Sequence, residues 1–202
     1  MAKRGAGGLV RLDQPVAVTP GQSWMHQSQG WPVLEALVNS DWPDNDALVT
    51  VVVARESPRS RKVGAATFLV DLGCLGIKNS IVRLSPTPRD YANGLRRDIL
   101  ARQQFHPIDF DLAAKIVLTG EAYARSLGLS QPADAAQAKL LLAGANPAAC
   151  AIPVRTGGPD GKPHFVSGPY DDSRRIVAHL TKTLGEGNFN YTVFLDAPLL
   201  EE

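Results

Sequence analysis

Four cationic side chains lie within eight residues of the sequence, and their type and spacing suit them to bind phosphate. Arg55, Arg59, Arg61 and Lys62 surround Pro58 in the stretch Arg-Glu-Ser-Pro-Arg-Ser-Arg-Lys. Because proline has no N–H to give to a β-ladder, this stretch is predicted to be the turn of a hairpin. Cations at the tip of a long hairpin could reach a phosphate backbone, although most exposed basic loops are only solvated.

A second polar group lies late in the chain and consists of His164, Asp171, Asp172 and His179. Imidazoles and carboxylates this close in sequence can hold a divalent metal or perform acid–base chemistry. The alternative is structural, because Asp171 or Asp172 follows the pair 168–169, Gly-Pro, where a helix N-cap is expected. His179 then borders the apolar face of that helix.

The corner Gly73-Cys74-Leu75-Gly76 contains a third candidate. A thiol at the end of a strand could be a nucleophile paired with one of the late histidines. The glycines lack the spacing of a nucleophile elbow, so Cys74 is instead predicted to be buried in apolar surroundings and unreactive. Asp71 and Lys78, on either side of the corner, are predicted to form a charge pair across it rather than a nuclease site.

The stretch 47–84 predicts the elements that position these groups. Two long strands, 48–56 and 63–71, are joined by the basic turn, and a third strand, 77–84, follows the glycine corner. β-Branched residues and short turns favour three consecutive antiparallel strands of one sheet. The first strand is apolar on both faces through Val53, which indicates an interior position in the sheet.

Helices are predicted both before and after these strands in the sequence. Residues 32–39 begin with a proline at the first helical turn and follow the apolar spacing of one helical face. Gly120 is predicted to let another element approach closely, because a mid-helix glycine costs about 1 kcal/mol relative to alanine. Three later helices are expected, of which the first two pack on the sheet: 88–102, 111–127 with Asp111 as its cap, and 132–143.

The last third of the chain is predicted to return to β structure. Residues 150–155 and 163–166 flank the glycine-rich turn 156–161 and are expected to pair as a hairpin. A helix and a final strand, 188–195, follow. Strand clusters separated by helices, rather than strict alternation, indicate an α+β fold.

Length and composition describe an ordinary globular chain of 202 residues, with 44% hydrophobic and 20% charged residues. Residues 1–30 are expected to be a flexible basic tail that becomes ordered near Trp24, and 31–202 a single α+β domain with a sub-boundary near 103–108. Lys plus Arg numbers 21 and Asp plus Glu 20, so net charge indicates no partner. Two cysteines without metal spacing predict neither a disulfide scaffold nor a metal or cofactor. No uncharged run is long enough to span a bilayer, so a cytoplasmic, bacterial-type protein without a membrane partner is expected.

The predicted order of elements in 31–102 resembles that of the double-stranded-RNA-binding domain. Both have a helix, a strand, a turn, two further strands and a helix, and in that family the first hairpin's loop enters the minor groove. The resemblance implies phosphate contact through the basic turn. That family also places a lysine cluster at the start of its last helix, where this sequence offers only Arg89.

A second resemblance is to a family of uncharacterised bacterial proteins. It depends on the segment Leu-Val-Asp-x-x-Cys-Leu-Gly-x-Lys, residues 69–78, together with residues 120–128. This resemblance implies one fold unit over most of the chain from Trp31 and carries no activity.

The leading hypothesis is therefore a non-catalytic protein that binds RNA or a ribonucleoprotein. Its contacts would be the basic tail and five side chains: Arg55, Arg59, Arg61, Lys62 and Arg89. One alternative is a small hydrolase or nuclease, with catalytic candidates His164, Asp171, Asp172, His179 and Cys74. Another is a protein-interaction subunit of a larger bacterial complex. The sequence alone does not separate these hypotheses.

Overall fold

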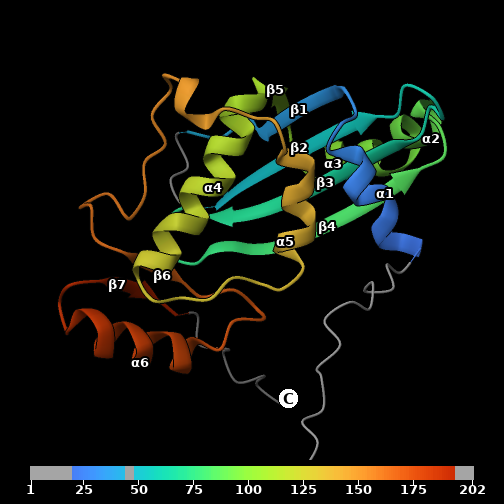
Figure 1. Cartoon of the computed structure of the whole chain (residues 1–202). Helices are drawn as coiled ribbons and strands as arrows, with labels where there is room; N and C mark the ends of the chain where they lie inside the picture. Colours follow the sequence, from blue (N-terminus) through green and yellow to red (C-terminus); the bar gives the residue numbers. More distant parts are fainter. Residues whose placement is uncertain (1–19, 44–47, 194–202) are drawn as a thin grey trace, which may run out of the picture.

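The main sheet has five antiparallel strands in the order β4-β3-β2-β1-β5. The computed structural model, which describes residues 20–43 and 48–193, is shown in Figure 1. The predicted strands are confirmed as consecutive antiparallel neighbours, and the first of them lies inside the sheet. The fold is α+β, and the strands are β1 (Val33–Asn39), β2 (Leu48–Glu56), β3 (Val63–Asp71), β4 (Gly76–Ser85) and β5 (Phe105–Pro107).

The two faces of the sheet differ in chemistry. Alternate residues of a strand point to opposite faces, so Val49, Val51 and Val53 share one face, which we name the first face. These valines are fully buried in the main hydrophobic core. Thr50 and Thr67, on neighbouring strands, point to the opposite side, which we name the second face.

The first face is covered by α4 (Phe110–Ser126), α5 (Ala135–Ala138) and the 3-10 helix η2 (Lys139–Leu142), and Figure 1 shows α4 and α5 lying across the strands. The predicted helix 111–127 is therefore confirmed, but its N-cap is Asp109 rather than Asp111. The Asp111 carboxylate instead accepts a hydrogen bond from the N–H of Asn146 at 2.7 Å. The predicted helix 132–143 is shorter than expected and changes to 3-10 geometry after Ala138.

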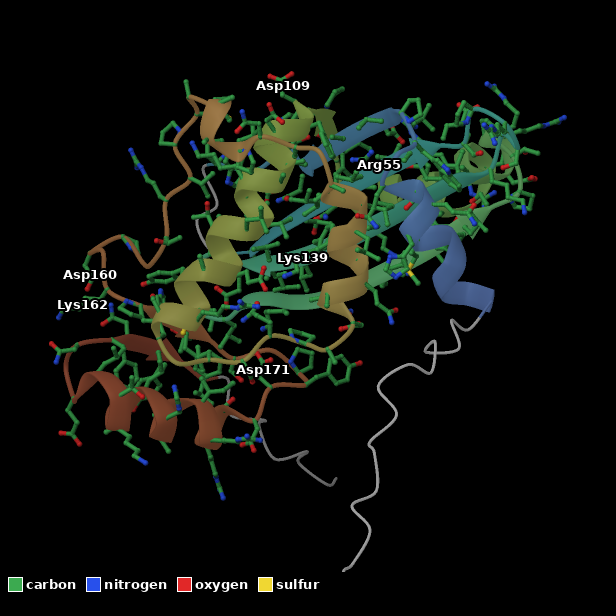
Figure 2. The ribbon with its side chains drawn as sticks, viewed as in Figure 1. Arg55, Asp109, Lys139, Asp160, Lys162 and Asp171 are labelled. Carbon is green, nitrogen blue, oxygen red and sulfur yellow. The ribbon has the colours of Figure 1, made fainter. Side chains whose placement is uncertain are left out.

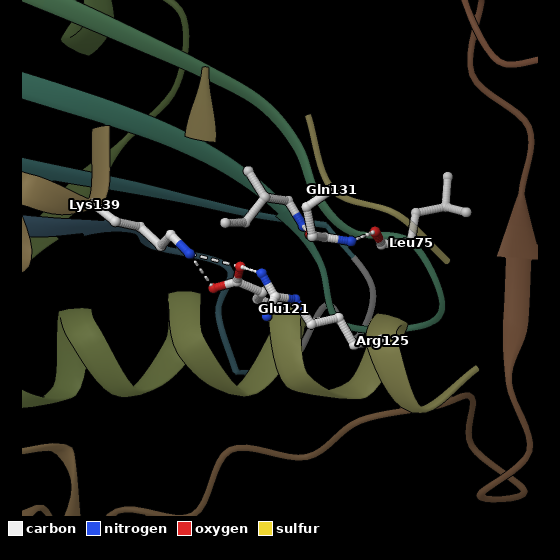
Figure 3. Close-up of polar contacts among 6 residues, drawn as sticks. Leu75, Glu121, Arg125, Gln131 and Lys139 are labelled. Atoms are coloured by element: carbon white, nitrogen blue, oxygen red, sulfur yellow. Dashed lines mark hydrogen bonds and ion pairs between the residues drawn. The ribbon is translucent and has the colours of Figure 1, made fainter. Parts of the chain in front are cut away.

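A buried carboxylate ties α4 to η2. Glu121 on α4 is only 6% exposed, and its two oxygens accept hydrogen bonds from Lys139 Nζ at 2.6 and 2.7 Å. Arg125, one turn along α4, donates to the same carboxylate at 2.6 Å (Figure 3). Close by, the Gln131 amide donates to the Leu75 carbonyl oxygen at 3.1 Å. Two cations thus satisfy the buried carboxylate, as a charge in an apolar core requires.

The second face carries a broken helix where a continuous helix 88–102 was predicted. Its parts are α2 (Pro88–Tyr91), the π-helix η1 (Ala92–Arg96) and α3 (Arg97–Leu100). The backbone at Gly94 lies outside the helical region, which separates the parts. The predicted cap is confirmed, because Thr87 Oγ1 accepts a hydrogen bond from the N–H of Asp90 at 3.2 Å.

The predicted helix 32–39 is wrong, because these residues form β1, between β2 and β5. Ala36 and Val38 face the main core while Leu37 points to the opposite side, so the second half of the apolar run is buried on both faces of the sheet. A short apolar run of this kind suits a helix and a buried strand equally. The observed order of elements over 31–102 therefore begins with a strand. The first helix of the double-stranded-RNA-binding domain has no counterpart in it.

The last third of the predicted tail 1–30 is helical, and order near Trp24 was expected. Pro20–Ser28 form the helix α1, with Met25 and Ser28 buried. Trp24 of α1 packs over β3 so closely that a Cβ atom at Gly64 would lie 2.5 Å from Trp24 Cζ3. The aromatic contact orders this segment. Residues 1–19 lie outside the described residues.

The predicted hairpin of 150–155 with 163–166 is also wrong. The strand β6 (His164–Val166) pairs in parallel with β7 (Asn190–Thr192), and α6 (Ser173–Leu184) forms the crossover between them. The glycine-rich turn instead meets the main sheet, because the N–H of Gly157 donates to the Leu72 carbonyl oxygen at 2.9 Å. This long-range contact takes the place of the local pairing. The part of the final strand prediction beyond Val193 lies outside the described residues.

The C-terminal elements pack on the glycine corner through a second apolar cluster. It contains the buried side chains Cys74, Leu127, Phe165, Leu180 and Phe189. Asp172 caps α6 by accepting a hydrogen bond from the N–H of Arg175 at 3.1 Å, as the sequence predicted for one of the two aspartates.

Replacing Gly120 with alanine tests the close approach of α4 to the sheet. A Cβ atom at this position would lie 2.5 Å from Val70 Cγ1, which confirms the predicted role of the glycine. We expect Gly120→Ala to lower the unfolding temperature, although alanine is favoured over glycine by about 1 kcal/mol in an unrestricted helix. Differential scanning calorimetry would measure the change, and an increased unfolding temperature would contradict this account.

Candidate nucleic-acid interface

The turn between β2 and β3 presents three exposed cations from a hydrogen-bonded loop. The N–H of Ser57 donates to the Lys62 carbonyl oxygen at 2.8 Å, and the N–H of Arg61 donates to the Ser57 carbonyl oxygen at 3.0 Å. Arg59, Arg61 and Lys62 are all exposed. Arg61 also pairs with Glu56, with Nη1 and Oε1 2.6 Å apart, while 69% of the Arg61 side chain stays exposed. The loop therefore holds its charges at the end of the sheet.

Arg89 joins this group through the pairing of the strands. Ser85 at the end of β4 lies opposite Val63 at the start of β3, and α2 begins three residues later. Figure 1 accordingly shows α2 beside the β2–β3 turn. Arg89 is exposed, and within the described ranges Arg59, Lys62 and Arg89 have no carboxylate partner. We name Arg59, Arg61, Lys62 and Arg89 together the basic tip.

A buried tyrosine fixes α2 to the sheet. Tyr91 packs against Ala54, Val63 and Ala65, and its hydroxyl donates to Glu35 Oε1 at 2.6 Å. Arg96 Nε donates to both oxygens of the same carboxylate, at 2.9 and 3.0 Å. Burial, followed by the hydrogen bond and charge of Glu35, raises the pKa of Tyr91. Because the phenol stays protonated, it remains a donor to Glu35 and holds α2 beside the turn.

The prediction that Arg55 contacts phosphate is wrong, because this side chain is buried beneath the helices of the first face. Its Nε donates to the Leu141 carbonyl oxygen at 2.7 Å, and its Nη1 donates to those of Trp31 at 2.7 Å and Gln29 at 3.1 Å. Its Nη2 donates to the Ala143 carbonyl oxygen. Figure 2 shows Arg55 between the sheet and its covering helices. Arg55 is thus a structural cation.

An aromatic ring completes the surroundings of Arg55. The guanidinium carbon lies 4.8 Å from the centre of the Phe110 ring, a distance at which cation–π attraction operates. Burial lowers the pKa of Arg55 from its ordinary value. The group stays charged, because arginine begins with a pKa far above neutrality. We name Arg55 with its four carbonyl partners the arginine clamp.

The late polar residues do not form one site. His179 Nε2 hydrogen-bonds to the Leu127 carbonyl oxygen at 2.9 Å, and His164 Nε2 hydrogen-bonds to Thr192 Oγ1 at 3.2 Å. Asp172 caps α6, whereas Asp171 accepts a hydrogen bond from Lys78 Nζ at 2.6 Å. Each of the four side chains therefore has a partner of its own. Across residues 20–43 and 48–193, no group of three or more His, Cys, Asp or Glu could hold a metal ion.

The predicted charge pair between Asp71 and Lys78 is replaced by two separate contacts. Lys78 makes its ion pair with Asp171, brought from the far end of the chain, and Figure 2 shows Asp171 beside the C-terminal elements. Asp71 Oδ1 accepts a hydrogen bond from the N–H of Cys74 at 2.9 Å, which closes the glycine corner. Cys74 is fully buried, as predicted, and burial raises the pKa of its thiol to about 12. Its reactivity stays a prediction.

The chain matches no protein-family model, no curated protein and no solved structure. The described part of the chain also has no helix of the length and apolarity needed to cross a membrane. The functional argument therefore depends on the geometry of this chain alone.

Sequence reasoning missed the polar groups of the second face. Glu35, which anchors both Tyr91 and Arg96, is a carboxylate within the apolar stretch taken for a helix. Arg83 lies two residues from Ile81 on β4, so the two point to the same face. The alternation along β4 predicts that Ile81 and Arg83 share a face. Only the structure shows that this face of the sheet is left partly uncovered.

Removing the arginine clamp should destabilise the fold strongly. Arg55→Met keeps a long side chain but leaves four carbonyl oxygens without their donor. We expect the free energy of unfolding to fall by about 3 kcal/mol or more, since hydrogen bonds from a charged group each contribute about 1.5–3 kcal/mol. Urea unfolding would measure it. The matched control, Arg59→Met on the exposed turn, should change stability by no more than about 0.5 kcal/mol, and equal stabilities for the two variants would contradict the clamp.

Asp71 should make stability depend on pH in a defined direction. Burial raises its pKa from 3.8 to about 6, although backbone N–H groups of the corner and the charge of Lys78 lower it. The folded protein therefore holds this proton more tightly than the unfolded chain. The resulting stabilisation is complete below about pH 4 and lost as pH rises through about 6, a change of up to about 3 kcal/mol.

The Asp71→Asn variant isolates this contribution, because asparagine keeps the oxygen that accepts the Cys74 N–H and cannot ionise. We expect the stability of the variant relative to wild type to increase between pH 4 and pH 7. Urea unfolding at several pH values would measure the difference. A constant difference, or one that decreases with pH, would show that Asp71 titrates normally.

Proposed function

We propose that this protein binds RNA or a ribonucleoprotein through the basic tip. The observation that carries the proposal is the placement of Arg59, Lys62 and Arg89, three exposed cations without carboxylate partners in the part of the chain described. Arg61 adds a fourth charge, shared with Glu56. Cations that project from the end of a sheet can approach a phosphate backbone without bringing the sheet into contact.

The proposal concerns phosphate contact rather than base recognition. Arginine and lysine position a protein on nucleic acid through phosphate oxygens, whereas sequence is recognised through base edges. The basic tip supplies guanidinium and ammonium groups and no aromatic ring for base stacking. We therefore expect affinity that varies little with sequence and falls steeply with salt.

The hydrolase or nuclease alternative has no comparable support. Its four polar candidates, His164, Asp171, Asp172 and His179, are each engaged in a local structural contact. A cytoplasmic location belongs to the same proposal. Both cysteines, Cys74 and Cys150, are free thiols, which suits a reducing compartment.

Salt titration of RNA binding tests the basic tip. Each phosphate contact contributes about −0.9 to the slope of log affinity against log salt, taking the duplex-DNA value as a guide. Four contacts should reduce affinity roughly a hundredfold between 50 and 200 mM salt. Fluorescence anisotropy with labelled hairpin, duplex and single-stranded RNA would measure both the slope and the dependence on sequence. Absence of salt-sensitive binding to all three probes at low salt would refute the proposal.

A neutralised variant assigns the contacts to the tip. We expect the slope to flatten, with equal weakening for all probes, in the variant Arg59→Gln, Arg61→Gln, Lys62→Gln and Arg89→Gln. Arg55 is left in place, because its replacement would reduce binding by destabilising the fold. The control neutralises three exposed cations of α6 and should bind as wild type: Arg174→Gln, Arg175→Gln and Lys182→Gln. Equal loss in both variants would show a general charge effect.

A further inference from the structure

A groove of about 630 Å³ separates the second face of the sheet from the broken helix. Figure 1 shows α2 and α3 on the opposite side of the sheet from α4 and α5. The volume lies within the range of small-molecule sites in proteins. None of the four residues of the basic tip lines this groove. It is therefore a second candidate site, chemically separate from the first.

Aliphatic side chains line the groove from both sides. Leu69 and Ile81 come from the sheet, and Leu95 and Ile99 come from the broken helix. Ile81 is 44% exposed, which is high for a residue of its kind on a strand. An apolar ligand would remove this surface from water, and burial of apolar area is favourable by roughly 25 cal/mol per Å².

The charge available in the groove is positive. Asp90 and Asp98 line it, but Asp90 accepts a hydrogen bond from Thr87 Oγ1 at 2.7 Å and Asp98 pairs with Arg97 at 2.9 Å. Arg83 and Arg102 also line it, and among the residues described neither side chain makes an ion pair or hydrogen bond. Arg97 thus compensates Asp98, whereas the neutral hydroxyl of Thr87 leaves Asp90 charged. Two arginines with free donors face one uncompensated acid, which favours an anionic group on the ligand.

Two further features lie along the groove. Thr67 contributes a hydroxyl that is buried and has no hydrogen-bond partner within the described residues. A buried hydroxyl without a partner is unfavourable. Gly94, at the break in the helix, also lines the groove, and a Cβ atom there would have no neighbour within 4 Å.

We propose that the groove binds a small amphipathic anion, namely a carboxylate carried on an aliphatic chain. The chain lies between Leu69, Ile81, Leu95 and Ile99, and the carboxylate accepts hydrogen bonds from the arginines of the rim. Charge complementarity selects this class, because an aliphatic lining without free cations would accept a neutral chain equally well. The inference stands independently of the RNA-binding proposal, since it uses different residues.

Isothermal titration calorimetry with three ten-carbon probes, each below its micelle concentration, tests the charge and the chain together. Decanoate should bind saturably with one site per chain. Decanol, which keeps the chain and lacks the charge, should bind at least about tenfold more weakly, because hydrogen bonds to a charged group are the stronger ones. Decyltrimethylammonium, with the opposite charge, should not bind. Equal affinity for decanoate and decanol, or no binding of decanoate, overturns the proposal.

Two variants place the binding in the groove. Arg83→Gln with Arg102→Gln should weaken decanoate about tenfold or more and leave decanol unchanged. The matched control, Arg174→Gln with Arg175→Gln on α6, should bind decanoate as wild type. Gly94→Leu, which fills the open space and keeps both arginines, should abolish the binding of decanoate and decanol, with circular dichroism and the unfolding temperature confirming the fold.

The outcomes separate this site from the basic tip. Neutralising the basic tip should leave the affinity for decanoate unchanged. Neutralising Arg83 and Arg102 should leave the salt dependence of RNA affinity unchanged. Decanoate that binds equally to wild type, the arginine variant and Gly94→Leu occupies another surface and overturns the proposal. If the wild-type protein binds decanoate as expected but does not bind RNA, the proposed function is rejected and the groove proposal stands.

Discussion

A single buried guanidinium joins segments that are remote in the sequence. Arg55 on β2 donates to the carbonyl oxygens of Gln29 and Trp31, which precede β1. It also donates to those of Leu141 in η2 and Ala143 directly after it. A charge away from water is tolerated only when its hydrogen bonds are made. Both chain segments must therefore reach the sheet together, and the start of β1 and the position of η2 depend on this one side chain.

The sheet divides the molecule into a packed side and an open side. On the first face, Val49, Val51 and Val53 meet helices whose one buried acid, Glu121, is satisfied by two cations. On the second face, Thr50 and Thr67 take the place of valine, and a broken helix covers only part of the strands. The first face thus carries the larger core, while the second face combines a smaller buried cluster around Tyr91 with polar groups beside an open groove.

Local sequence predicted the elements that local forces determine. The β-branched residues and short turns of β2, β3 and β4, and the cap of α6, each involve residues near one another in the chain. Residues 33–39 were misassigned because their apolar spacing fits one helical face, and a short apolar run suits a helix and a buried strand equally. Arg55 was misplaced for a related reason, since its partners Leu141 and Ala143 lie 86 and 88 residues away. The C-terminal hairpin failed because β6 pairs with a strand beyond α6.

The balance of charge in the composition conceals its separation in space. The net charge is only +1, which suggests no affinity for anions. Yet Glu121 is paired with Lys139, and Asp171 with Lys78. The cations of the basic tip and the groove mostly lack such partners among the described residues. Since a paired charge is already compensated, the unpaired cations of the basic tip and the adjoining groove are free to attract an anionic ligand there.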